Sequence, residues 1–174
     1  MRHAPSGAFG RDAHTQGVNV TTALERVSAQ TSVSQLLTVA STELAGLLDA
    51  RRVSVSRVIG DLLVELSNYD RSGQELPLEL FLVTDYPLTQ EVIEERVPRV
   101  VLRDDPDADA AETALLGKLG FDSLMMLPLH SAGQSWGLVE IYGDGRAFTP
   151  EEVEQSAAVV AEVGAVLAGL EGRA

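Results

Sequence analysis

The sequence contains no cysteine, and this absence excludes several kinds of chemistry at once. Disulfide scaffolds, thiolate metal sites, cysteine nucleophiles and chromophores attached through a thioether all need a sulfur atom that only cysteine supplies. The 174-residue chain must therefore hold its fold by packing, and with 45% hydrophobic residues it can bury a substantial core.

Basic residues are also scarce, with 13 Lys and Arg against 26 Asp and Glu and a net charge of −13. An acidic surface repels phosphate backbones, so we expect no nucleic-acid partner. The few basic residues are mixed with acidic ones and do not form a polybasic patch, so we expect no membrane partner either. Solubility is the simplest explanation of the acidity.

Long apolar runs are missing as well. Residues 124–129 are too few to cross a bilayer, and residues 157–170 are interrupted by Glu162 and by small side chains. Residues 1–7 are not followed by an apolar segment, so no secretory signal is visible, and we expect a cytoplasmic protein. The composition of residues 1–17 predicts a flexible tail, which leaves residues 18–174 as one domain.

The sequence gives little support for catalysis. Two of the three histidines, His3 and His14, fall in the predicted tail, so only His130 belongs to the predicted domain. A nucleophile and its base must meet in space and be oriented by a third group, and the adjacency of His130 and Ser131 does not provide this. The Gly-Asp-Gly of residues 143–145 lacks the lysine of a phosphate-binding loop. We therefore expect a protein that is not an enzyme.

The acidic run at residues 104–109 could suggest calcium, but it lacks the central glycine and the terminal glutamate of an EF-hand loop. Acidic side chains at the start of the next helix explain the run better, because they complement the helix dipole. We expect no metal and no cofactor.

Apolar spacing predicts the elements of the first half of the chain. A short helix is expected over residues 19–30, and a longer one follows at residues 33–48, capped by Ser32, with apolar side chains three and four positions apart. Two short strands are expected at residues 53–56 and 62–67, joined by a turn at residues 59–61 and followed by a surface connection over residues 68–75.

The middle of the chain predicts shorter elements. A strand is expected within residues 78–83, and Thr89 could cap a short helix that ends before Pro98. Residues 100–102 predict another strand, and residues 110–119 a helix that ends at Gly120.

The last third carries the strongest local signals. Residues 121–130 and 136–142 are rich in apolar, β-branched and aromatic side chains, and the turn residues 131–134 between them predict a hairpin. Residues 149–152 (Thr-Pro-Glu-Glu) then predict a capping box at the start of the final helix.

Taken in order, these pieces resemble the GAF domains, small cytoplasmic sensor modules, over roughly residues 32–170. The matching pieces are residues 85–88, 92–101, 104–107, 119–121, 127–129, 136–138 and 146–152. The resemblance implies an α/β (α+β) fold with a central antiparallel sheet of five to six strands. The terminal helices would cover one sheet face, and short helices and loops the other.

Short elements cover a sheet less completely than long helices do, so we expect a ligand pocket on the side of the middle segment. The resemblance implies the same location. The candidate ligand-binding residues are Phe81, Tyr86, Arg103, Asp105, Thr113 and Met126.

Arg103 could pair with an anionic group, Asp105 could accept from an N–H, and Tyr86 could stack on a ring. Each has a simpler alternative: core packing for Phe81 and Met126, a turn for Tyr86 and a solvated ion pair for Arg103.

Some functions found in the family need residues that this chain lacks. Members that reduce methionine sulfoxide or hold a bilin covalently use cysteine, and members that bind cyclic nucleotides carry an Asn-Lys-Phe-Asp signature that is absent here. A chromophore held without a covalent bond stays open.

The final helix carries Val153, Ala157, Val160, Gly164 and Leu167 on one stripe. The resemblance favours a homodimer through the terminal helices, whereas the alternative is a stripe that faces its own sheet. We expect a sensory or regulatory domain that binds an unknown small molecule non-covalently and signals through dimer contacts or a separate output partner. The alternative is a structural dimerisation or protein-interaction module with a collapsed pocket.

Overall fold

The computed structural model describes residues 19–73 and 78–172, and the predicted tail over residues 1–17 lies outside the described residues. Six strands form one antiparallel sheet in the order β3-β2-β1-β6-β5-β4. The strands are β1 (Arg52–Ile59), β2 (Leu62–Asp70), β3 (Leu80–Leu82), β4 (Arg99–Leu102), β5 (Ser123–Ser131) and β6 (Gln134–Gly143).

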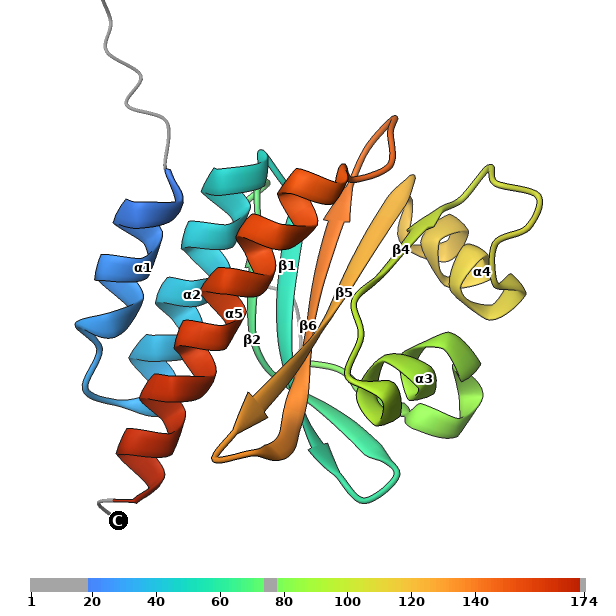
Figure 1. Ribbon diagram of the computed structural model, residues 1–174. Helices are drawn as coiled ribbons and strands as arrows, with labels where there is room; N and C mark the ends of the chain where they lie inside the picture. The colour runs from blue at the N-terminus through green and yellow to red at the C-terminus, as the bar shows by residue number, and fades with distance from the viewer. Residues whose placement is uncertain (1–18, 74–77, 173–174) are drawn as a thin grey trace, which may run out of the picture.

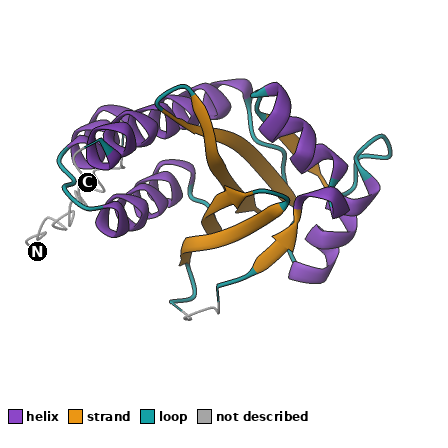
Figure 2. Ribbon diagram, turned by 90° about the horizontal axis from the view of Figure 1, so that it is seen from below, coloured by secondary structure: helices purple, strands orange, loops and turns teal. Residues whose placement is uncertain are grey.

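The helices lie on the two faces of this sheet (Figure 1). They are α1 (Val20–Ser28), α2 (Val33–Leu48), α3 (Pro87–Glu95), α4 (Ala110–Leu119) and α5 (Pro150–Glu171), with a short 3₁₀ helix, η1 (Val83–Asp85), before α3. The terminal helices α1, α2 and α5 share one face, and α3 and α4 lie on the other; Figure 2 shows the same separation from below. The predicted fold class is confirmed.

Local chemistry fixes the helix ends. Asn19, Ser32 and Asp109 each accept a hydrogen bond from a backbone N–H of the first turn. The predicted capping box at α5 is present, because Thr149 and Glu152 bond each other's backbone N–H. Gly120 ends α4 at a φ of 77°, as the sequence predicts.

Several predicted boundaries were wrong. Strand β1 is longer than residues 53–56, and β2 runs past residue 67 to Asp70, because the two strands pair along their full length. The hairpin turn is only Ala132 and Gly133, so β5 and β6 also extend further than predicted. Thr89 does not cap α3: the helix begins at Pro87, and Thr89 is buried within it.

Two apolar clusters fill the space on either side of the sheet. Because successive strand side chains point to opposite faces, Val53 and Val55 of β1 pack beneath the terminal helices, as do Val139 and Ile141 of β6. The alternate residues of β6, such as Leu138, join the smaller cluster beneath α3 and α4. The sheet therefore has a large apolar core on one face and a smaller one on the other.

Helix α5 packs closely on the sheet through its own stripe. Val160, Gly164 and Leu167 are buried, and α5 contacts β5, α1 and α2. By length and composition alone α5 could cross a membrane, which differs from the expectation that no segment could. Its burial against the sheet and two helices explains why the inward stripe is apolar.

The closest approach of α5 to the sheet is at Gly164, and it yields a stability prediction. A Cβ atom placed there would lie 2.0 Å from the backbone oxygen of His130 on β5. Alanine is favoured over glycine in a helix by about 1 kcal/mol, but forcing this contact apart costs about 1–3 kcal/mol. We expect Gly164→Ala to lower the free energy of unfolding in urea by up to about 2 kcal/mol, the difference between these two effects.

Gly117 of α4 is the matched control, because a Cβ atom there meets nothing within 4 Å. Gly117→Ala should raise the free energy of unfolding by up to about 1 kcal/mol. Equal effects of the two substitutions would contradict the close packing of α5 on β5.

Candidate functional site

Polar side chains are buried in the layer between the sheet and the middle helices. They come from β1, β2, β6, α3 and α4, and all are 6% exposed or less: Arg52, Ser54, Glu65, Thr89, Glu112, Glu140 and Tyr142. Strand alternation places the three residues of β1 and β6 that lie nearest this layer, Ser54, Glu140 and Tyr142, on the face opposite the large apolar core. The middle layer is thus polar at its centre, unlike the layer beneath the terminal helices.

Hydroxyl groups satisfy part of this cluster. The Tyr142 hydroxyl donates to Glu140 Oε1 at 3.1 Å, and the Ser54 hydroxyl donates to Glu140 Oε2 at 3.3 Å. The Thr89 hydroxyl donates to Glu112 Oε1 at 2.7 Å. Glu112 Oε2 is buried and has no hydrogen-bond partner among the described residues.

Of the three buried glutamates in this layer, one has a basic partner and two do not. Glu65 accepts from Arg52 at 3.1 Å and from the Asn68 amide at 2.6 Å. Neither Glu112 nor Glu140 has an ion pair with a basic side chain in the part of the chain that the structure describes. Buried carboxylates are normally paired, so these two are unusual.

Burial without a cation makes these carboxyl groups hard to ionise. Burial, and then the charge of Glu112, raises the pKa of Glu140 to about 7. Burial likewise raises the pKa of Glu112 and of Glu65 above the ordinary carboxyl value. Burial and the charge of Glu140 raise the pKa of Tyr142 well above its ordinary value, so its hydroxyl keeps its proton and remains a donor. Near neutral pH, Glu140 therefore exchanges a proton.

A small cavity opens beside this cluster, and we refer to it as the acidic cavity. It lies between the sheet and the segment η1–α3–α4, and its lining residues are Leu63, Phe81, Leu82, Val83, Tyr86, Thr89, Leu115 and Glu140. Its free space is about 10 Å³, which is room for about one water molecule. The Phe81 and Tyr86 rings meet edge to face in its wall, with centroids 6.0 Å apart.

The structure brings together three of the six predicted site residues. Phe81 and Tyr86 line the acidic cavity, and Met126 lies behind its wall, fully buried, with its sulfur 3.4 Å from the Thr89 hydroxyl. The alternative explanation for Met126, core packing, describes its surroundings too, because it belongs to the middle apolar cluster.

The other three predicted site residues lie elsewhere. Arg103 pairs with Asp122 at 2.8 Å and donates to the backbone oxygen of Phe121. Asp105 is exposed and accepts from a backbone N–H in its own loop. The Thr113 hydroxyl donates to a backbone oxygen of α4. None of the three lines the acidic cavity.

The prediction missed Thr89, Glu112 and Glu140, although the sequence carried a signal for two of them. Glu140 shares the strand face of Leu138 and Tyr142, and Glu112 shares the helix face of Leu115 and Leu116. A charged residue on an otherwise apolar face is a candidate functional residue.

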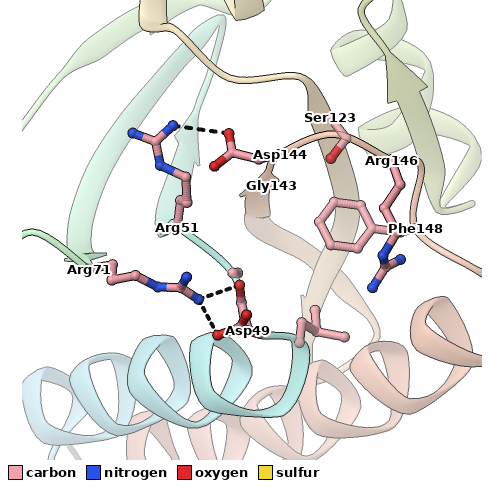
Figure 3. A pocket seen from close by; sticks show the side chains of 10 residues that line it. Asp49, Arg51, Arg71, Ser123, Gly143, Asp144, Arg146 and Phe148 are labelled. Carbon is pink, nitrogen blue, oxygen red and sulfur yellow. Dashed lines mark hydrogen bonds and ion pairs between the residues drawn. The ribbon is translucent and has the colours of Figure 1, made fainter.

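A second hollow, shown in Figure 3, lies where α2, β1 and the β6–α5 connection meet. Its charged side chains already neutralise one another in the pairs Arg51–Asp144, Arg71–Asp49 and Arg146–Glu152. The guanidinium group of Arg146 points away from the other two pairs, so the arginines do not converge on one point. Because ion pairs balance its charges, this hollow offers a weaker basis for ligand binding than the acidic cavity.

Comparisons with known proteins identify the fold. The model of the family described as GAF domain matches residues 32–167. The phycocyanobilin-bound GAF domain of a cyanobacterial phytochrome superposes with a TM-score of 0.79 at 18% identity, covering 89% of this chain and 97% of that one.

Two further solved structures are similar. The chromophore-binding domain of a bacteriophytochrome from R. palustris gives a TM-score of 0.78 at 13% identity, covering 89% of this chain and 62% of that one. The photosensory core module of a Stigmatella aurantiaca phytochrome gives 0.76 at 17% identity, covering 88% and 36%. No curated protein sequence matches the chain.

The raised pKa of Glu140 predicts an unusual pH dependence of stability. Between the ordinary carboxyl pKa of 4.5 and about 7, the folded state binds more protons than the unfolded state, so the free energy of unfolding falls as pH rises through this window. The loss attributable to Glu140 is on the order of 3 kcal/mol, and Glu112 and Glu65 add to it with the same sign. We expect the free energy of unfolding in urea to change less between pH 5 and about 7.5 in Glu140→Gln than in the wild type.

Glu152 provides a control with the opposite sign. Its bonds to Arg146 lower its pKa to about 2, so it contributes stability above pH 4.5 that is lost in acid. Glu152→Gln should alter only the acid limb of the profile. An unchanged slope near neutrality in Glu140→Gln would contradict the buried, proton-exchanging state of Glu140.

Proposed function

The chain belongs to the GAF domain family, and from this membership we propose that it is a sensory domain that binds a small molecule non-covalently in the acidic cavity. The cavity lies between the sheet and the short middle helices, where one face of the fold has the thinner cover. A ligand there would contact η1, α3, α4 and β6 together, so binding would favour one arrangement of these elements over another.

The observation that carries this proposal is the burial of Glu112 and Glu140 without a basic partner among residues 19–73 and 78–172. A buried carboxylate without a partner costs several kcal/mol, and filling the same space with leucine would avoid that cost. A purely structural core has no use for such groups. A ligand that donates hydrogen bonds to them would remove the cost in the bound state.

The size and chemistry of the site restrict the ligand. With no cysteine, the chain cannot hold a chromophore through a thioether. A tetrapyrrole is far larger than a space of about 10 Å³, so binding of a bilin would require a wide displacement of α3 and α4. A smaller molecule needs only a shift of the half-buried Phe81 and Tyr86 side chains. We therefore place the ligand among small metabolites.

We propose binding rather than catalysis. Thr89 and Glu112 form a hydroxyl–carboxylate pair, but no basic side chain lines the cavity among the described residues to stabilise a developing negative charge. His130 lies on β5, borders a groove with α5 and does not line the acidic cavity; burial, and then the charge of Arg96, lower its pKa.

Signalling is proposed to pass through the terminal helices. Val160, Gly164 and Leu167 of the predicted stripe face their own sheet, as the alternative explanation of the stripe holds. Ala157, Val160 and Ala161 of α5 nevertheless border a shallow groove with Leu127 and Pro128 of β5, and Ala161 is exposed. A second copy or an output partner could pack there.

The small free space favours a second candidate function, an interaction module whose cavity is closed by its own side chains. Such a module would use the terminal helices in the same way but would not respond to ligands. The two candidate functions differ in whether a ligand bound in the cavity stabilises the fold.

A thermal-shift panel of small metabolites separates them. We expect at least one compound to raise the melting temperature, because a ligand that binds only the folded state stabilises it by mass action. Leu115→Trp should abolish that shift, since Leu115 is nearly buried and lines the cavity from α4.

Ala114→Trp is the matched control, because Ala114 is the exposed neighbour on the same helix, and it should keep the shift. If Leu115→Trp does not fold, Leu115→Phe replaces it. No stabilising compound, or a shift that survives in a folded cavity-filled variant, would support the closed interaction module instead.

The dimer proposal has its own test. We expect light scattering on a sizing column to give about twice the 18.6 kDa chain mass for the wild type. Ala161→Arg should return the mass to one chain, because a long charged side chain cannot be buried unpaired at an interface. The control Ala114→Arg, on the opposite face, should remain dimeric. A monomeric wild type, or an A161R variant that stays dimeric, would exclude this interface.

A further inference from the structure

We propose that the ligand of the acidic cavity is a small organic cation with N–H donors, of the amine, amidine or guanidine class, held between Glu112, Glu140 and the rings of Phe81 and Tyr86. This inference rests on the proposed function, because it assigns a chemical class to the molecule that binds there.

Hydrogen-bond capacity in the cluster is unbalanced in favour of acceptors. Glu112 and Glu140 together present four carboxylate oxygens, each able to accept more than one hydrogen bond. The side-chain donors that reach them are three hydroxyl groups, from Ser54, Thr89 and Tyr142, and the backbone of Thr89 also favours the ionised form of Glu112. One oxygen, Glu112 Oε2, receives no hydrogen bond from the described residues. What the site lacks is therefore side-chain N–H donors, which an ammonium or guanidinium group carries in excess.

The charge balance agrees with the hydrogen-bond count. The basic side chain nearest this cluster is Arg52, and it is already engaged by Glu65 at 3.1 Å and approached by Glu79 at 3.9 Å. No basic residue lines the cavity in the described ranges 19–73 and 78–172. An anionic ligand would meet two carboxylates and no cation, whereas a cation would supply the missing partner.

The unbonded carboxylate oxygen belongs to a residue that lies just behind the cavity wall. Thr89 lines the cavity and its hydroxyl contacts Glu112, so Glu112 stands directly behind the wall. Burial, and then the charges of Glu112, Asp85 and Glu140, raise the pKa of Tyr86, which lines the cavity together with Glu140. Both carboxylates are therefore near enough to Tyr86 to act on it electrostatically.

The aromatic pair completes the match to a cation. Phe81 and Tyr86 meet at an interplanar angle of 85°, so the face of one ring is turned toward the edge of the other. A cation is attracted to the face of an aromatic ring, most strongly where water is excluded. Phe81, Tyr86 and Glu140 all line the cavity, and carboxylates beside aromatic rings are surroundings in which proteins bind organic ammonium groups.

The test compares probes of similar shape and different charge on the complete chain. The cations are benzylammonium, phenylguanidinium, methylguanidinium and agmatine, and the matched probes are neutral benzyl alcohol and anionic benzoate. We expect at least one cation to raise the melting temperature and to bind at least tenfold more tightly in calorimetry than benzyl alcohol. Benzoate should not bind.

Glu112→Gln keeps the shape of the side chain and removes its charge, so it should weaken binding of the stabilising cation at least tenfold. Glu43→Gln is the control, because Glu43 is a buried glutamate of α2 that pairs with Arg26 beneath the terminal helices. It should leave the affinity unchanged.

A second readout is the pH dependence of binding. The titratable and charged groups around the Glu140 carboxyl are Arg52 of β1, Glu65 of β2, Tyr86 before α3, Glu112 of α4 and Tyr142 of β6. A cation favours ionised carboxylates, so its affinity should rise at least fivefold from pH 5.5 to 8, with protons released to the buffer on binding.

The outcomes distinguish a failure of the proposed ligand class from a failure of the proposed function. If benzyl alcohol or benzoate stabilises the protein as well as the cations do, and Leu115→Trp abolishes the effect, the cavity binds ligands but the cationic class is wrong. If a cation binds equally well to Glu112→Gln, or with no pH dependence, the assignment to these carboxylates is overturned. If neither these probes nor the metabolite panel binds, both the ligand class and the proposed function fail.

Discussion

The strict alternation of side chains along β1 and β6 is the constraint on which the rest of the structure depends. These two central strands pair with each other, so every second residue of both faces the same layer. Val53, Val55, Val139 and Ile141 supply one layer with apolar surface, while Arg52, Ser54, Glu140 and Tyr142 supply the other with polar groups. A one-residue slip of either strand would exchange the two sets, so the apolar core and the polar cluster fix the register together.

The two layers divide stability and function between them. The layer beneath α1, α2 and α5 is mainly apolar and contains the close contact of Gly164 with β5, as expected of a region that holds the fold. Within the part of the chain that the structure describes, the layer beneath α3 and α4 buries two carboxylates without basic partners and leaves one oxygen unbonded. Proteins accept such local costs at functional sites and offset them by packing elsewhere. In this chain the offset comes from the larger core on the opposite face.

Membership of the GAF family and similarity to phytochrome domains identify the fold but not the ligand. At 18% identity or less the similarity concerns the path of the backbone, and ligand recognition depends on side chains. The cavity is lined by the Glu140 carboxyl group, the Thr89 hydroxyl, the Phe81 and Tyr86 rings and aliphatic side chains, with no basic side chain among the described residues, and Glu112 lies behind Thr89. They therefore carry more information about the ligand than the family does.

The sequence by itself determined the elements and their faces, because caps, turns and apolar spacing act over a few residues: the capping box at Thr149 and the end of α4 at Gly120 were both predictable. The tertiary structure alone decided which polar residues meet. Arg103 was a plausible ligand contact until Asp122, 19 positions away, proved to be its partner. Thr89, Glu112 and Glu140 come from α3, α4 and β6, and nothing local in the sequence relates them. A site is built from contacts between distant segments, and such contacts exist only once the sheet and helices have packed.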